Sequence, residues 1–186
     1  LQRKRLVEYH TLLTGNPIFQ DRLMGTGKIS KETAIGYGLT GPCLRGSGVP
    51  FDLRRAEPYL VYDKLKFEVP TGLQGDCWDR YNVRMKEIEQ SLNIVEQCLD
   101  QIPAGEVRAR VPQRMKPPRG EYYGRIEASR GEHGFYVYSD GTSNIYRIKV
   151  RAPSFSNLSV LEAVLPGCKV ADAIAVIGSL DFTLGD

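Results

Sequence analysis

The longest regular pattern of apolar side chains in this sequence lies between Asp76 and Leu99. Its apolar residues recur at alternating spacings of three and four, which is typical of one face of an α-helix. Asp76 stands where a carboxylate caps the first turn, Asp79 adds negative charge at the positive end of the helix dipole, and Pro103 follows the last turn. The sequence therefore predicts a long central helix over residues 76–99. We expect its apolar stripe to belong to the core rather than to a cofactor site or a coiled coil; the stripe consists of Trp78, Tyr81, Met85, Ile88, Leu92, Val95 and Leu99.

Three shorter helical patterns precede this helix. Residues 5–13 carry apolar side chains on one helical face, residues 18–24 form a second candidate, and Ser30 begins a third that ends near Ile35. The first pattern starts without a preceding cap, and the chain begins with Leu rather than Met. We therefore expect the chain to be a piece of a longer polypeptide whose first half is absent.

A glycine-rich and arginine-rich stretch, GPCLRGSGVPFDLRR, occupies residues 41–55. Its glycines and prolines exclude a long regular element, so we expect a tight loop that arginine–carboxylate pairs hold in place. Two alternatives are a phosphate cradle, although the stretch matches neither common phosphate-binding motif, and the lining of a buried polar cavity. The alternation that follows, over residues 59–69, predicts a strand or an extended segment.

The second half of the chain begins with a connector and continues as a sheet. Residues 103–120 are rich in proline and arginine but lack interleaved aromatic residues, which favours an extended linker over a nucleic-acid site. Strand-like runs then follow at 122–127, 134–139 and 145–150, with a turn at Asp140-Gly141, and they predict an antiparallel meander. Two helices close the chain, over 157–165 and 171–180, the second with Ile174, Ile177 and Leu180 as its buried residues.

These elements define an α+β fold that is mainly helical. We expect one domain over residues 1–186, in which helices occupy 1–102, the linker 103–120, the β meander 121–151 and the C-terminal helices 152–186.

Composition narrows the possible functions. Hydrophobic residues make up 41% of the chain and charged residues 25%, as in an ordinary globular protein, and the formal charge of +3 is too small to argue for nucleic acid. The sequence has no apolar run of about 18 residues, so membrane association would have to be peripheral, through a partner. Its four cysteines are far apart and it has only two histidines, so the sequence offers few ligands at the spacing of a metal site. Reduced thiols in a cytosolic compartment are the favoured interpretation.

Five stretches, taken together and in order, resemble a known family. They are GLTGPCLRGSGVPFDLR, GDCWDRYNVRMKEIEQSL, ASRGEHGFYVYSDG, YRIKVRAPSF and IGSLDFTLGD. They resemble the C-terminal half of the quinone-site D subunit, or 49-kilodalton subunit, of respiratory complex I. This family belongs to the wider group of nickel–iron hydrogenase large subunits. The resemblance runs through nearly the whole chain and implies a hydrogenase large-subunit-like fold.

The resemblance also implies where a site should lie. Hydrogenases of this superfamily carry a cysteine pair near the end of the chain, at positions where this sequence has Thr183 and Asp186. A hydroxyl and a carboxylate cannot replace bridging thiolates around a soft nickel–iron centre, which argues against hydrogenase activity. The same region is the quinone pocket in the complex I branch. The expected pocket residues are therefore Asp181, Phe182, Thr183 and Leu184, and this chain is expected to bind no metal.

Three arginines are secondary candidates for fixing carboxylates or loops near the pocket: Arg45, Arg54 and Arg151. For each of them an ordinary buried ion pair is the favoured interpretation. The quinone-binding histidine and tyrosine of the family lie in its N-terminal half, and neither His10 nor His133 matches their motifs. We expect His133, on a predicted strand, to be a structural histidine with satisfied hydrogen bonds.

As the resemblance implies, the parent protein sits in the peripheral arm of NADH-quinone oxidoreductase and forms a quinone pocket with an iron–sulfur subunit. NAD and the iron–sulfur clusters belong to partner subunits, quinone is the substrate, and quinone reduction drives proton translocation. The expected location is the cytoplasmic side of a cell inner membrane, or the matrix side of the mitochondrial inner membrane. The short link at 110–119 leaves related deazaflavin- or ferredoxin-linked complexes open. A membrane-bound hydrogenase-type complex and a non-catalytic assembly subunit are further alternatives.

Overall fold

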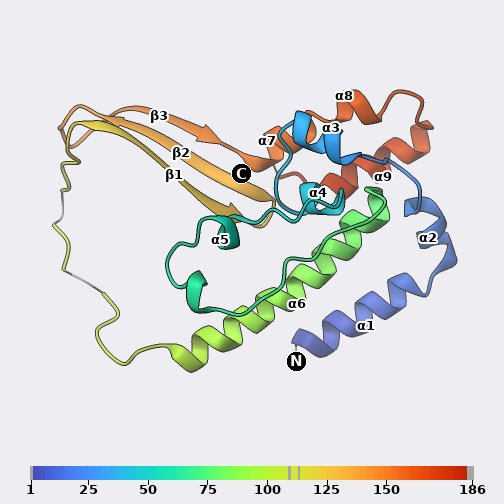
Figure 1. Ribbon diagram of the computed structural model, residues 1–186, viewed down its shortest axis with the longest axis horizontal. Coiled ribbons are helices and arrows are strands. Elements are labelled where there is room, and N and C mark those ends of the chain that lie inside the picture. The colour runs from blue at the N-terminus through green and yellow to red at the C-terminus, as the bar shows by residue number, and fades with distance from the viewer. Residues whose placement is uncertain (1, 109, 113, 184–186) are drawn as a thin grey trace.

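The computed structural model describes residues 2–108, 110–112 and 114–183. A long helix, α6 (Cys77–Gln101), runs diagonally through the molecule with α1 (Gln2–Thr14) alongside it, and a three-stranded sheet lies on the other side (Figure 1). The remaining elements are α2 (Pro17–Leu23), α3 (Lys31–Gly36), α4 (Gly41–Gly46), α5 (Leu53–Ala56), the 3₁₀ helix η1 (Tyr62–Lys64), β1 (Gly120–Ala128), β2 (Gly131–Ser139), β3 (Ile145–Arg151), α7 (Pro153–Leu158), α8 (Leu161–Val164) and α9 (Val170–Leu180). The α+β class is confirmed. No described helix is both long enough and apolar enough to cross a membrane.

The start of α6 follows the predicted capping chemistry. The Asp76 carboxylate accepts a hydrogen bond from the Asp79 backbone N–H at 2.9 Å. The Asp79 carboxylate in turn accepts from the backbone N–H groups of Leu73 and Gly75, at 2.8 and 3.0 Å. These bonds satisfy donors that a helix start leaves open and fix the chain that leads into α6.

The face that α6 buries differs from the predicted one. Ile88, Val95 and Leu99 are 45%, 53% and 66% exposed, so the assignment of the whole apolar stripe to the core is wrong. The first part of the stripe does pack: Trp78 and Tyr81 contact Phe19 of α2 edge to face, with ring centroids 6.1 and 5.2 Å apart. The buried residues of α6 are Cys77, Arg80, Val83 and Ile94. The helix turns this face inward because α4 and α9 supply hydrogen-bonding and ionic partners for its polar side chains.

The second and third helices of the chain each begin at a side-chain cap, and Ser30 is the predicted start of the third. Asn16 caps α2 and Ser30 caps α3 through their side-chain oxygens. The stretch at 41–55 is more regular than a loop, because it contains the short helices α4 and α5. Residues 59–69 form no strand and contain η1 instead. Their backbone is paired with side chains of α6: the N–H of Lys66 donates to Gln97 at 2.8 Å and that of Glu68 to Gln90 at 3.1 Å.

The sheet is the predicted antiparallel meander, in the order β1-β2-β3. Its register places Tyr136 opposite Tyr123 on β1 and opposite Lys149 on β3. Because side chains alternate between the two faces of a strand, one face carries mainly apolar residues and the other mainly polar ones. The apolar face includes Tyr122, Ile126, Phe135, Val137, Ile148 and Val150; the polar face includes Tyr123, Glu127, Glu132, Tyr136, Lys149 and Arg151.

The C-terminal helices differ in part from expectation. One predicted helix over 157–165 is replaced by α7 and α8, because Pro153 starts a helix four residues earlier and suits its first turn. Leu180 is buried in α9 as predicted, whereas Ile174 is 76% exposed and Val176 is buried in its place. Leu180 joins the main apolar cluster, which also contains Ile29, Ala34, Leu39, Cys43, Leu44 and Val160. The described residues between α6 and β1 form neither helix nor strand.

Candidate functional site

A cavity of about 880 Å³ lies where the end of the sheet meets α7 and the C-terminal segment. Its lining is mainly apolar. Two of the four expected pocket residues, Phe182 and Thr183, lie on its wall, and Arg151 of the secondary candidates lies there too. Leu184 falls outside the described residues, as does Asp186. The other lining residues are Tyr123, Tyr136, Lys149, Val150, Ala152, Ser154, Phe155, Ser156 and Leu158.

Asp181 fixes the direction in which the chain leaves α9. It is the C-cap of that helix and has a left-handed backbone conformation, with φ of 54°. Its carboxylate lies 3.5 Å from Arg130 of the β1–β2 turn and 3.6 Å from Arg84 of α6, and its carbonyl accepts from Arg130 at 3.2 Å. Asp181 is not among the residues that line the cavity. Its contacts with Arg130 and Arg84 instead connect the C-terminal segment to the sheet and to α6. The Thr183 N–H then donates to Ser154 at 3.2 Å.

Arg151 has a structural role at the edge of the cavity. Its guanidinium donates to the backbone carbonyls of Glu132 at 2.6 Å and Gly38 at 3.1 Å, and it lies 3.9 Å from the Glu132 carboxylate. These contacts join the end of β3 to β2 and to the turn after α3. Most of the donor groups of Arg151 are thus directed at protein rather than at the cavity.

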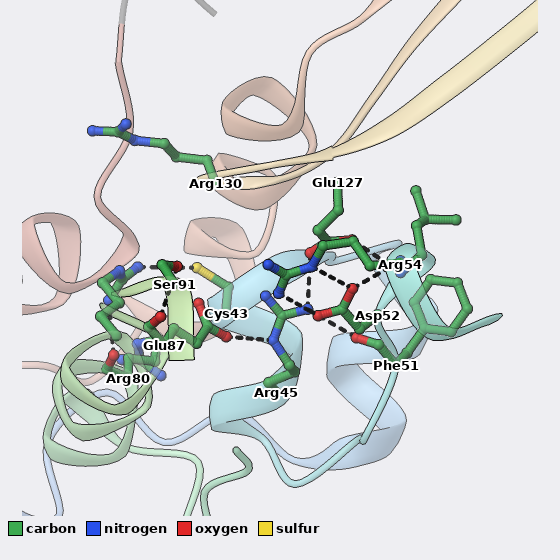
Figure 2. Close-up of polar contacts among 12 residues, drawn as sticks. Cys43, Arg45, Phe51, Asp52, Arg54, Arg80, Glu87, Ser91, Glu127 and Arg130 are labelled. Atoms are coloured by element: carbon green, nitrogen blue, oxygen red, sulfur yellow. Dashed lines mark hydrogen bonds and ion pairs between the residues drawn. The ribbon is translucent and has the colours of Figure 1, made fainter. Parts of the chain in front are cut away.

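Arg45 and Arg54 lie in a separate buried cluster of charges (Figure 2). Arg45, whose side chain is 2% exposed, donates to Glu87 of α6 at 2.5 Å and to Glu127 of β1 at 2.8 Å, and it lies 3.6 Å from Asp52. Arg54 binds Asp52 with two donors, at 2.9 and 2.6 Å. The arginine–carboxylate pairs expected for this stretch are present, and they join α4, α5, α6 and β1.

Burial and charge shift the pKa values in this cluster in opposite directions. Burial raises the pKa of Glu127, even though Arg45 stabilises its charged form. For Asp52, burial acts in the same direction, but hydrogen bonds from Arg54 and the nearby charges of Arg54 and Arg45 outweigh it and lower the pKa. The cluster contains three carboxylates and two guanidinium groups in close contact, and this arrangement is that of a structural ion-pair network.

The sequence pattern does not predict a second group of cations, Arg80 and Arg84, which lies on α6. Arg80 is fully buried and donates to the carbonyls of Gly27 and Gly75 and to the Ser179 hydroxyl, at 2.8–3.0 Å. Arg84, one turn later, donates to the Arg80 carbonyl at 3.1 Å and contacts Cys43 at 3.6 Å. Charged residues within an amphipathic helix usually face solvent, so only their spacing of four could have indicated a shared face.

The cysteines and histidines form no site in the described part of the chain. No group of three or more His, Cys, Asp or Glu residues that could hold a metal ion occurs there. Burial raises the pKa of the Cys43 thiol, although Arg84 and Arg80 oppose that shift, and this favours an unreactive thiol. His133 stacks on Phe135 with ring centroids 4.9 Å apart, but its Nε2 is buried without a hydrogen-bond partner. The expectation of a fully satisfied histidine is therefore wrong.

Tyr123, Tyr136 and Lys149 on the sheet wall were also missed. Each lies on a strand that the alternation pattern predicts, but no local motif marks them. The signal that could have found them is the register of three antiparallel strands, which aligns them in one row.

Comparison with known proteins identifies the family. The chain matches the family model described as "Respiratory-chain NADH dehydrogenase, 49 Kd subunit", in two overlapping segments over residues 1–117 and 109–186. Because these segments cover the whole chain, the protein belongs to this family, and the resemblance inferred from the sequence is confirmed.

Several curated relatives carry one name. A protein of Desulforamulus reducens, named as the D subunit of NADH-quinone oxidoreductase, is 51% identical over 179 residues, which is 96% of this chain and 49% of the relative. Proteins of the same name from Syntrophobacter fumaroxidans and Geobacillus thermodenitrificans are 51% and 50% identical over 98% and 99% of this chain. They too extend well beyond it, with 49% and 50% of their lengths matched. The chain thus spans about half the length of the curated relatives it matches.

Proposed function

We propose that the full-length parent of this chain is the D subunit of NADH-quinone oxidoreductase, in the peripheral arm of complex I. We further propose that this chain is its C-terminal half, and that the cavity beside Phe182 and Thr183 is part of the site where quinone is reduced. The main observation in support is that, in a chain about half identical to proteins named as this subunit, two of the four expected pocket residues, Phe182 and Thr183, lie on the wall of a cavity of about 880 Å³. That volume lies within the range of ordinary ligand pockets.

The proposed role of this chain is to hold and shield the quinone. Mainly apolar walls suit the ring and its tail and exclude water, which strengthens the few polar contacts within. Quinone becomes quinol by taking up two electrons and two protons, and the electrons arrive singly from an iron–sulfur cluster of the partner subunit. Redox energy from this step then drives proton translocation in membrane subunits. NAD and the clusters belong to other subunits, and this chain binds no cofactor of its own.

We also propose a fold relationship and a location for the parent protein. The fold is that of the nickel–iron hydrogenase large subunits, with Thr183 at a position where those enzymes carry a cysteine. A hydroxyl there favours quinone over a nickel–iron centre. The parent protein binds to the membrane through partner subunits, on the cytoplasmic side of a cell inner membrane or on the matrix side of the mitochondrial one.

The first test is affinity purification of the full-length parent from detergent-solubilised membranes, with mass spectrometry of the proteins that accompany it. An iron–sulfur subunit together with multi-span membrane subunits is the expected result, and the electron-input subunits among them would identify the donor. Purification of the protein alone, or with soluble partners only, would contradict the proposal.

Thr183→Met tests the cavity itself. The larger side chain narrows the space beside Phe182, so we expect the concentration of a quinone-site inhibitor needed for half-inhibition to rise roughly tenfold in the assembled complex. Thr11→Met, on an exposed part of α1, is the matched control and should leave inhibition unchanged. Equal inhibition of both variants, at normal assembly, would show that this cavity does not hold the quinone.

A further inference from the structure

The sheet wall of the cavity carries a cross-strand row of three polar side chains. Tyr123 of β1, Tyr136 of β2 and Lys149 of β3 stand directly opposite one another in the register, and all three line the cavity. Neighbouring strands lie about 4.8 Å apart, so the row spans a distance comparable to an aromatic ring ligand with its oxygen substituents.

The two tyrosines form an aromatic floor with occupied hydroxyl groups. The Tyr123 hydroxyl donates to Glu132 at 3.1 Å, and the end of its ring lies against Gly134, where any side chain would collide with it. Burial, and then hydrogen bonding to a carboxylate, raises the pKa of both phenols, through Glu132 for Tyr123 and Glu121 for Tyr136. Both hydroxyls therefore stay protonated and are engaged with protein at neutral pH.

Lys149 differs from its neighbours in the row. Its ammonium group has neither a hydrogen bond nor an ion pair with any residue that the structure describes, whereas Arg151, two residues later, donates to the backbone carbonyls of Glu132 and Gly38. Across the cavity from the sheet the lining includes Phe155, Leu158 and Phe182. The cavity thus combines an aromatic floor, apolar walls and one cation whose donors are free to bind a ligand.

We infer that Lys149 binds the ligand of this cavity through a ring oxygen, with the ring packed over the Tyr123–Tyr136 floor. The inference rests on the proposed function and adds to it a residue that determines affinity for the quinone head group. A carbonyl oxygen accepts from the ammonium in the oxidised state. When electrons reach the ring, negative charge develops on that oxygen, and the Lys149 cation, which lines a mainly apolar cavity, stabilises that charge.

Lys149→Gln in the assembled complex tests this role. It removes the charge but keeps a polar side chain of similar length, and because Lys149 has no protein partner among the described residues, the fold and assembly should not change. We expect the KM for a short-chain quinone to rise roughly tenfold or more, as for the loss of a hydrogen bond to a charged group. Lys149→Arg keeps the charge and should retain most of the affinity.

Arg147→Gln is the matched control, because it removes one positive charge from the same face of β3 outside the cavity lining. It should leave the KM unchanged. Equal KM values for the Lys149→Gln and Arg147→Gln variants, whether both normal or both raised, would overturn the inference. If Thr183→Met alters inhibitor binding while Lys149→Gln has no effect, only the role of Lys149 fails. If neither variant has an effect, the proposed function fails as well.

Discussion

At the scale of single residues, the clearest feature is that the buried charged side chains around Arg45 do not line the cavity. Arg45 is surrounded by Glu87, Glu127 and Asp52, and none of these four residues lines the cavity. Their contacts join elements that are far apart in the sequence. The Arg45 cluster is therefore best understood as part of the framework that positions the sheet against α4 and α6.

Replacing Arg45 with methionine tests this structural role. The change leaves three carboxylates buried with only Arg54 beside them, so we expect the free energy of unfolding of the full-length protein to fall by about 3–5 kcal/mol. Arg3→Met is the control: Arg3 pairs with Glu96 on the surface, and its loss should cost less than about 1 kcal/mol. Urea unfolding of both variants measures the difference, and a similar small loss for both would contradict a buried framework.

At the scale of elements, the decisive contact joins the start of α4 to the β1–β2 turn. Gly41 has a positive φ of 65°, and a Cβ atom there would lie 2.5 Å from the Arg130 carbonyl oxygen. Asn157 of α7 bridges the same two segments: it accepts from the Thr40 N–H at 3.1 Å and donates to the Arg130 carbonyl at 3.0 Å. The close approach of backbone to backbone sets the position of the sheet relative to the helices.

Gly41→Ala should separate these elements. The added methyl group collides with backbone and the left-handed conformation is strained, so we expect a loss of at least about 2 kcal/mol in the free energy of unfolding. In Gly36→Ala, the control, the new methyl group meets open space at the end of α3, and the change should be neutral or slightly stabilising. Thermal unfolding of the two variants distinguishes them, and equal melting temperatures would contradict the argument.

At the scale of the whole molecule, the cavity depends on three distant parts of the chain. Strands β1–β3 form one wall, α7 another, and the segment after α9 completes it. Asp181 holds this last segment through Arg130 and Arg84, which lie in the β1–β2 turn and in α6. The position of Phe182 and Thr183 is therefore a property of the packed molecule rather than of α9.

Asp181→Asn separates this anchoring from backbone conformation, because asparagine tolerates the left-handed region but carries no charge. We expect quinone-site inhibitor affinity in the assembled complex to fall severalfold, with a loss of only about 1 kcal/mol in stability, since the side chain is 42% exposed. Asp181→Ala should lose about 1 kcal/mol more through backbone strain. An Asp181→Asn complex with unchanged inhibitor affinity would show that the two ion pairs do not position the cavity wall.

The sequence by itself determined the local features of this protein. Asp76, Ser30 and Asn16 each start a helix through bonds within a few residues, and the three strands follow from alternation and a turn. These signals are readable because the partners lie close together in the chain. Family membership was also readable, because five ordered motifs are specific even without a structure.

Only the tertiary structure decided which faces meet. The inward turn of Arg80 on α6, the Glu87 and Glu127 partners of Arg45, and the alignment of Lys149 with two tyrosines all depend on contacts between distant segments. A buried charge is stable only where such partners exist, and hydrophobic periodicity contains no information about them. Because periodicity alone cannot show that α6 buries the face with Arg80, it predicts Ile88, Val95 and Leu99 in the core, whereas the structure leaves these three residues exposed.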